Sequence, residues 1–175
     1  MKGLVIYSDY ITIENENHVR LFGRLENGQS FITINKFEPY LYIKKKDSKR
    51  ISDKLKTESA GFKNFDGEEV IKIAFKNRTE LTEFDKKFHH DFPTYEADIK
   101  PNYRFLIDKN IFGGIEIKGD YQASEKVDRI YKKPEIFPSE FKPNLKIVSI
   151  DTESEKETGK LISFCLIKQE AIIAK

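Results

Sequence analysis

The feature that most constrains the fold is a pair of alternating apolar–polar stretches joined by Asn27-Gly28. The two stretches cover residues 19–26 and 30–35. Asn-Gly between such stretches is the strongest short hairpin signal, because a type I′ turn needs positive φ at both central residues. With an earlier apolar run and the segment Tyr40–Ile43, these strands predict a small antiparallel sheet or a partial barrel.

Strand and helix signals alternate over residues 40–99. Ile51 and Leu55 lie four residues apart in a charged segment, which predicts a helix over residues 47–58. The remaining signals are a hairpin at Asp66-Gly67, a helix start at Asn77 followed by Glu80, and a closing strand over residues 94–99. Strand, helix, hairpin, helix, strand is the order of the ferredoxin-like or RNA-recognition-motif-like βαββαβ sandwich, so we expect an α+β fold.

Composition excludes several functional classes. The 175 residues contain one Cys, no Trp and three His, which argues against a disulfide scaffold and a thiolate zinc site. We expect Cys165, in an apolar stretch, to be buried. No apolar run approaches the roughly 20 residues of a membrane span, so we expect a soluble cytoplasmic protein.

The net charge of +2 says little about partners, but basic residues cluster locally. The densest stretch is Lys44-Lys45-Lys46, Lys49, Arg50, Lys54 and Lys56. It could face phosphate groups, or it could be the solvated face of a surface helix, and we favour the second interpretation.

A domain boundary is predicted over residues 132–145, which contain three prolines and little periodicity. The β-branched run Leu145–Ile150 that follows is typical of a central strand buried on both faces. Residues 161–167 and 171–174 are predicted to be its partners in one sheet. Two or three strands without a covering layer are marginal, so we expect the chain to be truncated or continued elsewhere.

Asp151 and Glu153 follow this strand directly. Residues two apart in a strand face the same side, so the two carboxylates are predicted to project together. Hard cations such as Mg²⁺ prefer oxygen ligands, and two-metal sites hydrolyse phosphodiesters. A solvated acidic turn over residues 153–157 is the simpler alternative.

Four segments, in the same order along the chain, resemble those of family B DNA polymerases. They are Asp9–Thr12 with Val19–Arg24, Phe37–Tyr42, Tyr95–Ile99 with Tyr103–Asp108, and Leu145–Glu153. The last resembles the family's first exonuclease motif, an apolar strand followed by Asp-Ile-Glu. Thr152 departs from the usual apolar middle residue, but it faces away from the two carboxylates.

The resemblance implies that residues 1–143 form the template-binding N-terminal domain. Residues 144–175 would begin a ribonuclease-H-like 3′–5′ exonuclease, with Asp151 and Glu153 as catalytic ligands of Mg²⁺ or Mn²⁺. The later exonuclease motifs and the polymerase domains are absent, so we expect this chain alone to be inactive. DNA is then its partner, deoxynucleotides bind only the full-length enzyme, and no membrane is involved.

The resemblance also implies a pocket for template uracil. In archaeal members of the family such a pocket stalls the enzyme, and its residues match Tyr10, Pro39 and Tyr40. A close-fitting pocket can exclude the methyl group that distinguishes thymine from uracil. The alternative is that Tyr10 and Tyr40 are ordinary aromatic residues that pack a small core.

Two rival hypotheses remain open. A stand-alone module that binds single-stranded nucleic acid would explain the βαββαβ order, although it would not need Asp151 and Glu153 together. A naturally split polymerase would explain an unfinished sheet edge, which a partner chain could pair with.

Overall fold

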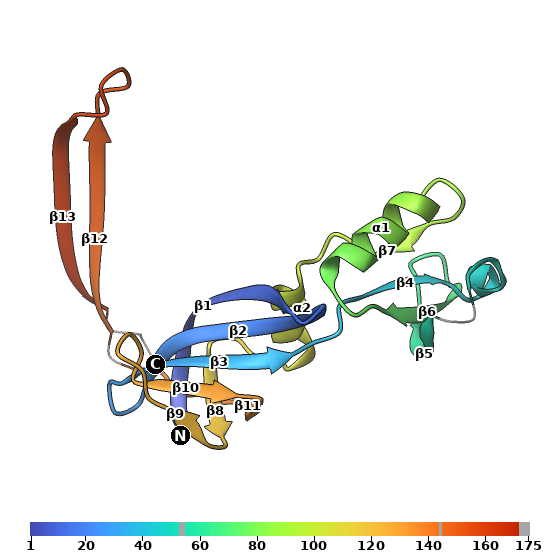
Figure 1. Cartoon of the computed structure of the whole chain (residues 1–175), viewed down its shortest axis with the longest axis horizontal. Helices are drawn as coiled ribbons and strands as arrows, with labels where there is room; N and C mark the ends of the chain where they lie inside the picture. The colour runs from blue at the N-terminus through green and yellow to red at the C-terminus, as the bar shows by residue number, and fades with distance from the viewer. Residues whose placement is uncertain (53–54, 144, 172–175) are drawn as a thin grey trace. The chain divides into compact units, whose positions relative to one another are not determined.

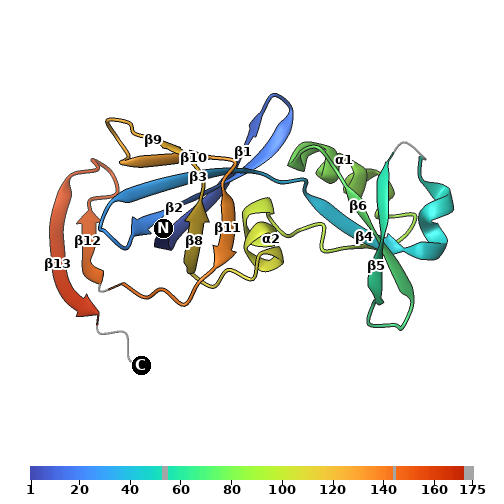
Figure 2. The same ribbon diagram turned by 90° about the horizontal axis from the view of Figure 1, so that it is seen from below.

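The computed structural model describes residues 1–52, 55–143 and 145–171. The chain divides into two compact units, Met1–Glu140 and Phe141–Lys175, which are described separately (Figures 1 and 2). The elements of the first unit are β1 (Lys2–Ile13), β2 (Glu16–Leu25), β3 (Ser30–Lys36), β4 (Tyr40–Lys44), the 3₁₀ helix η1 (Lys45–Arg50), β5 (Lys56–Lys63), β6 (Glu69–Ala74), α1 (Arg78–Phe88), β7 (Thr94–Tyr95), α2 (Pro101–Asp108), β8 (Gly114–Lys118), β9 (Tyr121–Gln122), β10 (Arg129–Lys132) and β11 (Glu135–Pro138). The second unit contains β12 (Leu145–Ser154) and β13 (Leu161–Ala171).

A seven-stranded sheet in the order β11-β8-β1-β2-β3-β10-β9 dominates the first unit (Figure 1). Strands β1, β2 and β3 form an antiparallel meander, and β10 joins β3 in parallel. The antiparallel sheet expected at the N-terminus is therefore present. It is completed by strands from residues 114–138, a region that includes part of the segment expected to be an irregular boundary.

The turns of this sheet differ in type from the prediction. The hairpin at Asn27-Gly28 forms, but only Gly28 has positive φ, at 84°, and its N–H bonds Leu25 O. This is a longer loop that ends in one left-handed glycine rather than a type I′ turn. The tight turn with positive φ at both positions is Glu14-Asn15, between β1 and β2, which lacks the Asn-Gly signature.

The core of the seven-stranded sheet lies on the face that α2 covers. Val19, Leu21 and Phe31 alternate with less buried residues along β2 and β3 and are at most 1% exposed. Helix α2 begins at Pro101, where the missing N–H costs least, as predicted, and Phe105 packs into this core.

Strand β4 follows β3 in the chain but belongs to a second sheet. This sheet has the order β5-β6-β4-β7, and every neighbouring pair is antiparallel. The N-terminal prediction grouped β4 with the first three strands, and that grouping is wrong. In the second sheet the elements follow the order strand, 3₁₀ helix, two strands, α-helix, strand.

The helix predicted over residues 47–58 is not formed. A 3₁₀ helix ends at Arg50, Ile51 is extended with ψ 162°, and β5 already begins at Lys56. Ile51 and Leu55 both pack against the core of the second sheet. Their four-residue spacing therefore does not mark one face of a helix.

The core of the second sheet lies between the strands and α1. Leu41, Ile43 and Ile73 are fully buried on the face that meets Leu81 and Phe84 of α1. The helix starts at Asn77 as predicted, and the closing strand β7 is only two residues long. Neither α1 nor α2, nor any other helix in the described part of the chain, is long and apolar enough to cross a membrane.

The second unit is an antiparallel hairpin of β12 and β13. In the run predicted to be buried on both faces, the described apolar side chains are not buried, since Val148 is 49% and Ile150 is 65% exposed. Cys165, expected to be buried, is exposed on β13. Both corrections have one physical reason, because two strands alone have no second layer to cover them. The residues predicted to form a third strand fall partly outside the described residues, and β13 itself continues to Ala171.

Candidate functional site

Asp151 and Glu153 lie near the C-terminal end of β12, close to the turn that leads to β13. They pair with Cys165 and Ser163 of β13, and the ladder is regular between them because its one register shift comes after Glu153. Successive side chains of a regular strand alternate in direction, so both carboxylates leave the same face. Ser163 Oγ donates to Glu153 Oε2 at 3.4 Å.

These two carboxylates fit part of a divalent cation site. Both residues are exposed, and within the described ranges neither forms an ion pair with a lysine or arginine. Their oxygen atoms suit Mg²⁺ or Mn²⁺. No group of three metal-ligating side chains occurs among the residues that the structure describes, so the donor set is incomplete.

Tyr10, Pro39 and Tyr40 all belong to the first unit, where Tyr10 lies on β1 and Pro39 directly precedes Tyr40, the first residue of β4. Tyr10 is half-buried on β1 and packs against the core of the seven-stranded sheet, as does Phe37. Pro39 is buried, and its carbonyl accepts the N–H of Phe75. Phe37 is also close to Tyr40, since their ring centroids are 6.3 Å apart.

The Tyr40 ring is closed in. It is 7% exposed, Lys72 Nζ lies 4.3 Å from its centroid, and the Arg104 guanidinium lies 4.8 Å from it. Its hydroxyl donates to Asp108 Oδ1 at 2.6 Å. Burial, followed by this hydrogen bond, raises the pKa of Tyr40 above its ordinary value. A base could stack on this ring only if Lys72 or Arg104 moved.

Helix α2 contributes two polar atoms that sequence reasoning missed. Asn102 Oδ1 and Arg104 Nε are buried and have no hydrogen-bond partner among the described residues. Asn102 Nδ2 donates to Ser8 O and Oγ, both at 3.1 Å, and Arg104 pairs with Glu96. Unpaired buried polar groups are costly, and such atoms are commonly satisfied by water or a ligand.

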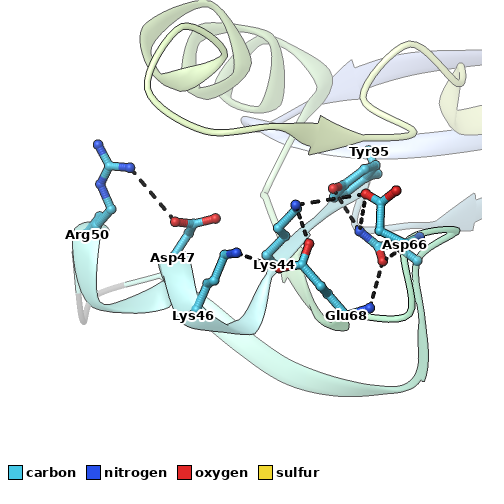
Figure 3. A network of polar contacts seen from close by, with 8 residues as sticks. Lys44, Lys46, Asp47, Arg50, Asp66, Glu68 and Tyr95 are labelled. Atoms are coloured by element: carbon cyan, nitrogen blue, oxygen red, sulfur yellow. Dashed lines mark hydrogen bonds and ion pairs between the residues drawn. The ribbon is translucent and has the colours of Figure 1, made fainter.

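The basic stretch that begins at Lys44 is largely neutralised. Lys44 and Lys46 both bind the carboxylate of Glu68 (Figure 3). Lys45 Nζ lies 2.7 Å from Glu69 Oε2. The two lysines hold the pKa of the Glu68 carboxyl at about 2. Lys54 lies outside the described residues. A solvated, paired surface is thus favoured over a phosphate-facing patch, although a six-residue 3₁₀ helix stands where a longer helix was expected.

An aromatic cleft on the second sheet was also missed. It has a volume of about 430 Å³, lies on the face opposite α1, and is lined by four rings, those of Tyr42, Phe62, Phe65 and Tyr95. Phe62 and Phe65 both precede the Asp66-Gly67 turn closely, so aromatic residues beside a turn signal were the available clue. The rings meet only because β4, β6 and β7 pair, which no local pattern reveals.

Comparisons with known proteins agree on one relationship. A DNA polymerase of Archaeoglobus fulgidus is 31% identical over 185 aligned positions, which cover 91% of this chain and 22% of that polymerase. The solved family B DNA polymerase of Pyrobaculum calidifontis shares the fold with a TM-score of 0.72, covering 96% of this chain and 25% of that one at 18% identity. No protein-family model matches the chain. In sequence the chain is similar to a DNA polymerase, and in fold it is similar to part of a family B DNA polymerase.

Proposed function

We propose that this chain is the part of a DNA-directed DNA polymerase that binds the single-stranded template and supplies the first two carboxylates of a 3′–5′ exonuclease. The observation that carries the proposal is the pair Asp151 and Glu153 on one face of a regular ladder, in a chain related to DNA polymerases. The chain spans 22% of the curated relative. Polymerisation and deoxynucleotide binding then belong to the rest of the enzyme.

In this proposal Asp151 and Glu153 hold Mg²⁺ or Mn²⁺ together with carboxylates from outside this chain. The cations, when bound, supply activation of water and stabilisation of the leaving oxygen. The chain's own contribution is positional, because the β12–β13 ladder keeps the two carboxylates on one face. Since the described residues offer no third ligand, we expect the chain alone to be inactive.

The exonuclease assignment is tested in the full-length polymerase with Asp151→Asn combined with Glu153→Gln. Each change keeps side-chain size and removes the negative charge that a cation requires. We expect loss of 3′–5′ exonuclease activity with primer extension retained. Retained proofreading would exclude both residues from the metal site.

Uracil reading is a narrower proposal that rests on Tyr10, Pro39 and Tyr40. The two unpartnered atoms of α2, Asn102 Oδ1 and Arg104 Nε, support it because they can hydrogen-bond a base edge. Binding then requires Lys72 or Arg104 to move off the Tyr40 ring.

Fluorescence anisotropy with a single strand containing one uracil, against the thymine-matched strand at the same salt concentration, tests this proposal. We expect tighter binding of the uracil strand, and loss of that preference in Tyr40→Ala. Tyr121→Ala, at a 49% exposed tyrosine, is the matched control. Circular dichroism must show that Tyr40→Ala is folded. Equal affinity for both strands would remove uracil reading and leave template binding intact.

A further inference from the structure

Two of the rings that line the aromatic cleft of the second sheet, Phe62 and Phe65, are exposed to solvent. Phe65 is fully exposed at the tip of the β5–β6 hairpin, at 111% of its reference area, and Phe62 is 52% exposed. The Tyr42 and Phe62 ring centroids are 5.1 Å apart and edge-on. Exposed apolar surface of this kind, gathered in one concave place, marks a binding site more often than an accident of packing.

The backbone around the cleft is built to hold these rings outward. The β5–β6 ladder shifts register between Ser59 and Lys63, and Gly61 within that irregularity has φ 76°. Asn64 closes the hairpin, with its Oδ1 accepting the N–H groups of Asp66 and Glu68, while its Nδ2 donates to the Tyr95 hydroxyl at 3.0 Å. One asparagine therefore ties the hairpin tip to β7 and fixes the positions of two cleft walls.

The charges around the cleft favour an anionic occupant. Glu96, the carboxylate among its lining residues, pairs with Arg104. In the adjoining hairpin, Asp66 and Glu68 pair with Lys44, and Glu68 also binds Lys46. Lys63 lines the cleft and forms no direct ion pair within the described ranges, because Glu69, opposite it in the ladder, binds Lys45. The rim thus carries one available cation and no uncompensated carboxylate among these groups.

We propose that this cleft binds unstacked bases of single-stranded nucleic acid, with Phe65 and Phe62 as stacking surfaces and Lys63 at the backbone phosphate. This inference rests on the proposed template-binding function and gives that function a site made of other residues than Tyr10, Pro39 and Tyr40. The two sites are neighbours, because the Tyr42 and Tyr40 ring centroids are 5.5 Å apart. Every base has a flat π-face, so stacking on these rings is tolerant of sequence. A duplex does not qualify, because its bases are already stacked and paired.

Anisotropy with a 5′-labelled oligothymidylate of about 12 nucleotides, bound to the 175-residue chain at low salt, tests the proposal. Phe65→Ala removes a fully exposed ring, so it leaves the fold intact, and we expect it to weaken binding by about 5- to 100-fold. Phe112→Ala is the matched control, because Phe112 is also an exposed phenylalanine, at 93%, and lies outside the cleft. An abasic strand of equal length keeps the phosphates and removes the stacking partners, so it should bind weakly and equally to wild type and Phe65→Ala.

The outcomes separate this inference from the proposed function. If binding is unchanged in Phe65→Ala, or is reduced equally in Phe112→Ala, the cleft is not the binding site. Template binding would then occur at another surface. An abasic strand that binds as tightly as oligothymidylate also excludes the cleft as the binding site. If wild type binds no single strand at all, the template-binding proposal fails together with the cleft, and a protein segment becomes the occupant to test.

Discussion

Gly23 illustrates how one residue can decide a sheet. It lies on β2 opposite Val5, where β1 shifts its register. A Cβ atom built at Gly23 would lie 1.9 Å from Leu4 O and 2.6 Å from Phe31 Cε1. The first of these contacts is with backbone and cannot be relieved by rotating a side chain. Glycine is therefore required here for close approach, not for an unusual φ angle.

Gly23→Ala should lower the free energy of unfolding by about 2–4 kcal/mol, because β1 or the Phe31 ring must shift. Urea unfolding followed by circular dichroism measures the change. Gly28→Ala is the control, since its Cβ meets nothing within 4 Å and only the strain of φ 84° is added, about 1 kcal/mol. Equal losses in the two variants would contradict the close-approach argument.

Glu68 is the most strongly perturbed carboxylate at the surface. Lys44 and Lys46 both donate to it, and together they lower its pKa from 4.5 to about 2 (Figure 3). The folded state therefore keeps Glu68 ionised at pH values where the unfolded chain protonates it. The resulting stabilisation is fully present above pH 4.5 and is lost as the pH falls towards 2.

Glu68→Gln should remove this component of the pH dependence. Between pH 5 and 2 the wild type is expected to lose more stability than the variant, and the difference should shrink in 1 M salt. Urea unfolding at a series of pH values is the measurement. Glu69→Gln, which removes a carboxylate bound by one lysine, is the control. Parallel pH profiles for wild type and Glu68→Gln would refute the assignment.

At the scale of elements, Asn77 connects the start of α1 to the first sheet. Its Oδ1 accepts the Glu80 N–H at 3.0 Å, which caps the helix, and Glu80 Oε2 accepts the Lys76 N–H at 3.2 Å. Its Nδ2 donates to Asn15 Oδ1 at 2.8 Å, in the turn between β1 and β2. The sequence signal at Asn77 and Glu80 predicted the cap, whereas the bond to Asn15 depends on the packing of two sheets.

Asn77→Ala should cost about 1–3 kcal/mol, since it loses both the cap and a buried hydrogen bond. Asn77→Asp keeps the cap acceptor and loses only the donor to Asn15. Amide hydrogen exchange separates the two roles. The Glu80 amide should exchange faster in the alanine variant and stay protected in the aspartate variant. Fast exchange of Glu80 in both variants would mean that the bond to Asn15 holds the helix start.

For the whole molecule, the two units differ in how many of their apolar side chains are buried. The first unit buries two cores, one beneath each sheet. In the second, the described side chains of β12 and β13 are exposed on both faces of the ribbon, for example Ile150 at 65% on one face and Ile167 at 52% on the other. A two-stranded ribbon is marginal in water, so the stability of the chain should reside in the first unit.

Residues 1–140 alone should therefore fold with a Tm within about 4 °C of the full chain. Limited proteolysis of the full chain should remove residues after 140 first, because their strands have no protecting layer. Differential scanning calorimetry of the two forms makes the comparison. A much lower Tm for residues 1–140 would show that the hairpin contributes to the core.

Local signals determined the hairpins at Asn27-Gly28 and Asp66-Gly67, the cap at Asn77, the helix start at Pro101, and the resemblance to family B DNA polymerases. These features are short-range, so neighbouring residues specify them. Tertiary structure alone decided that β4 joins a second sheet, that Ile51 is extended after a 3₁₀ helix, and that Tyr40 is buried. It also assembled the aromatic cleft from four separated positions. The physical reason is that strand pairing and burial depend on partners distant in the chain, whereas periodicity reports only which side chains share a face.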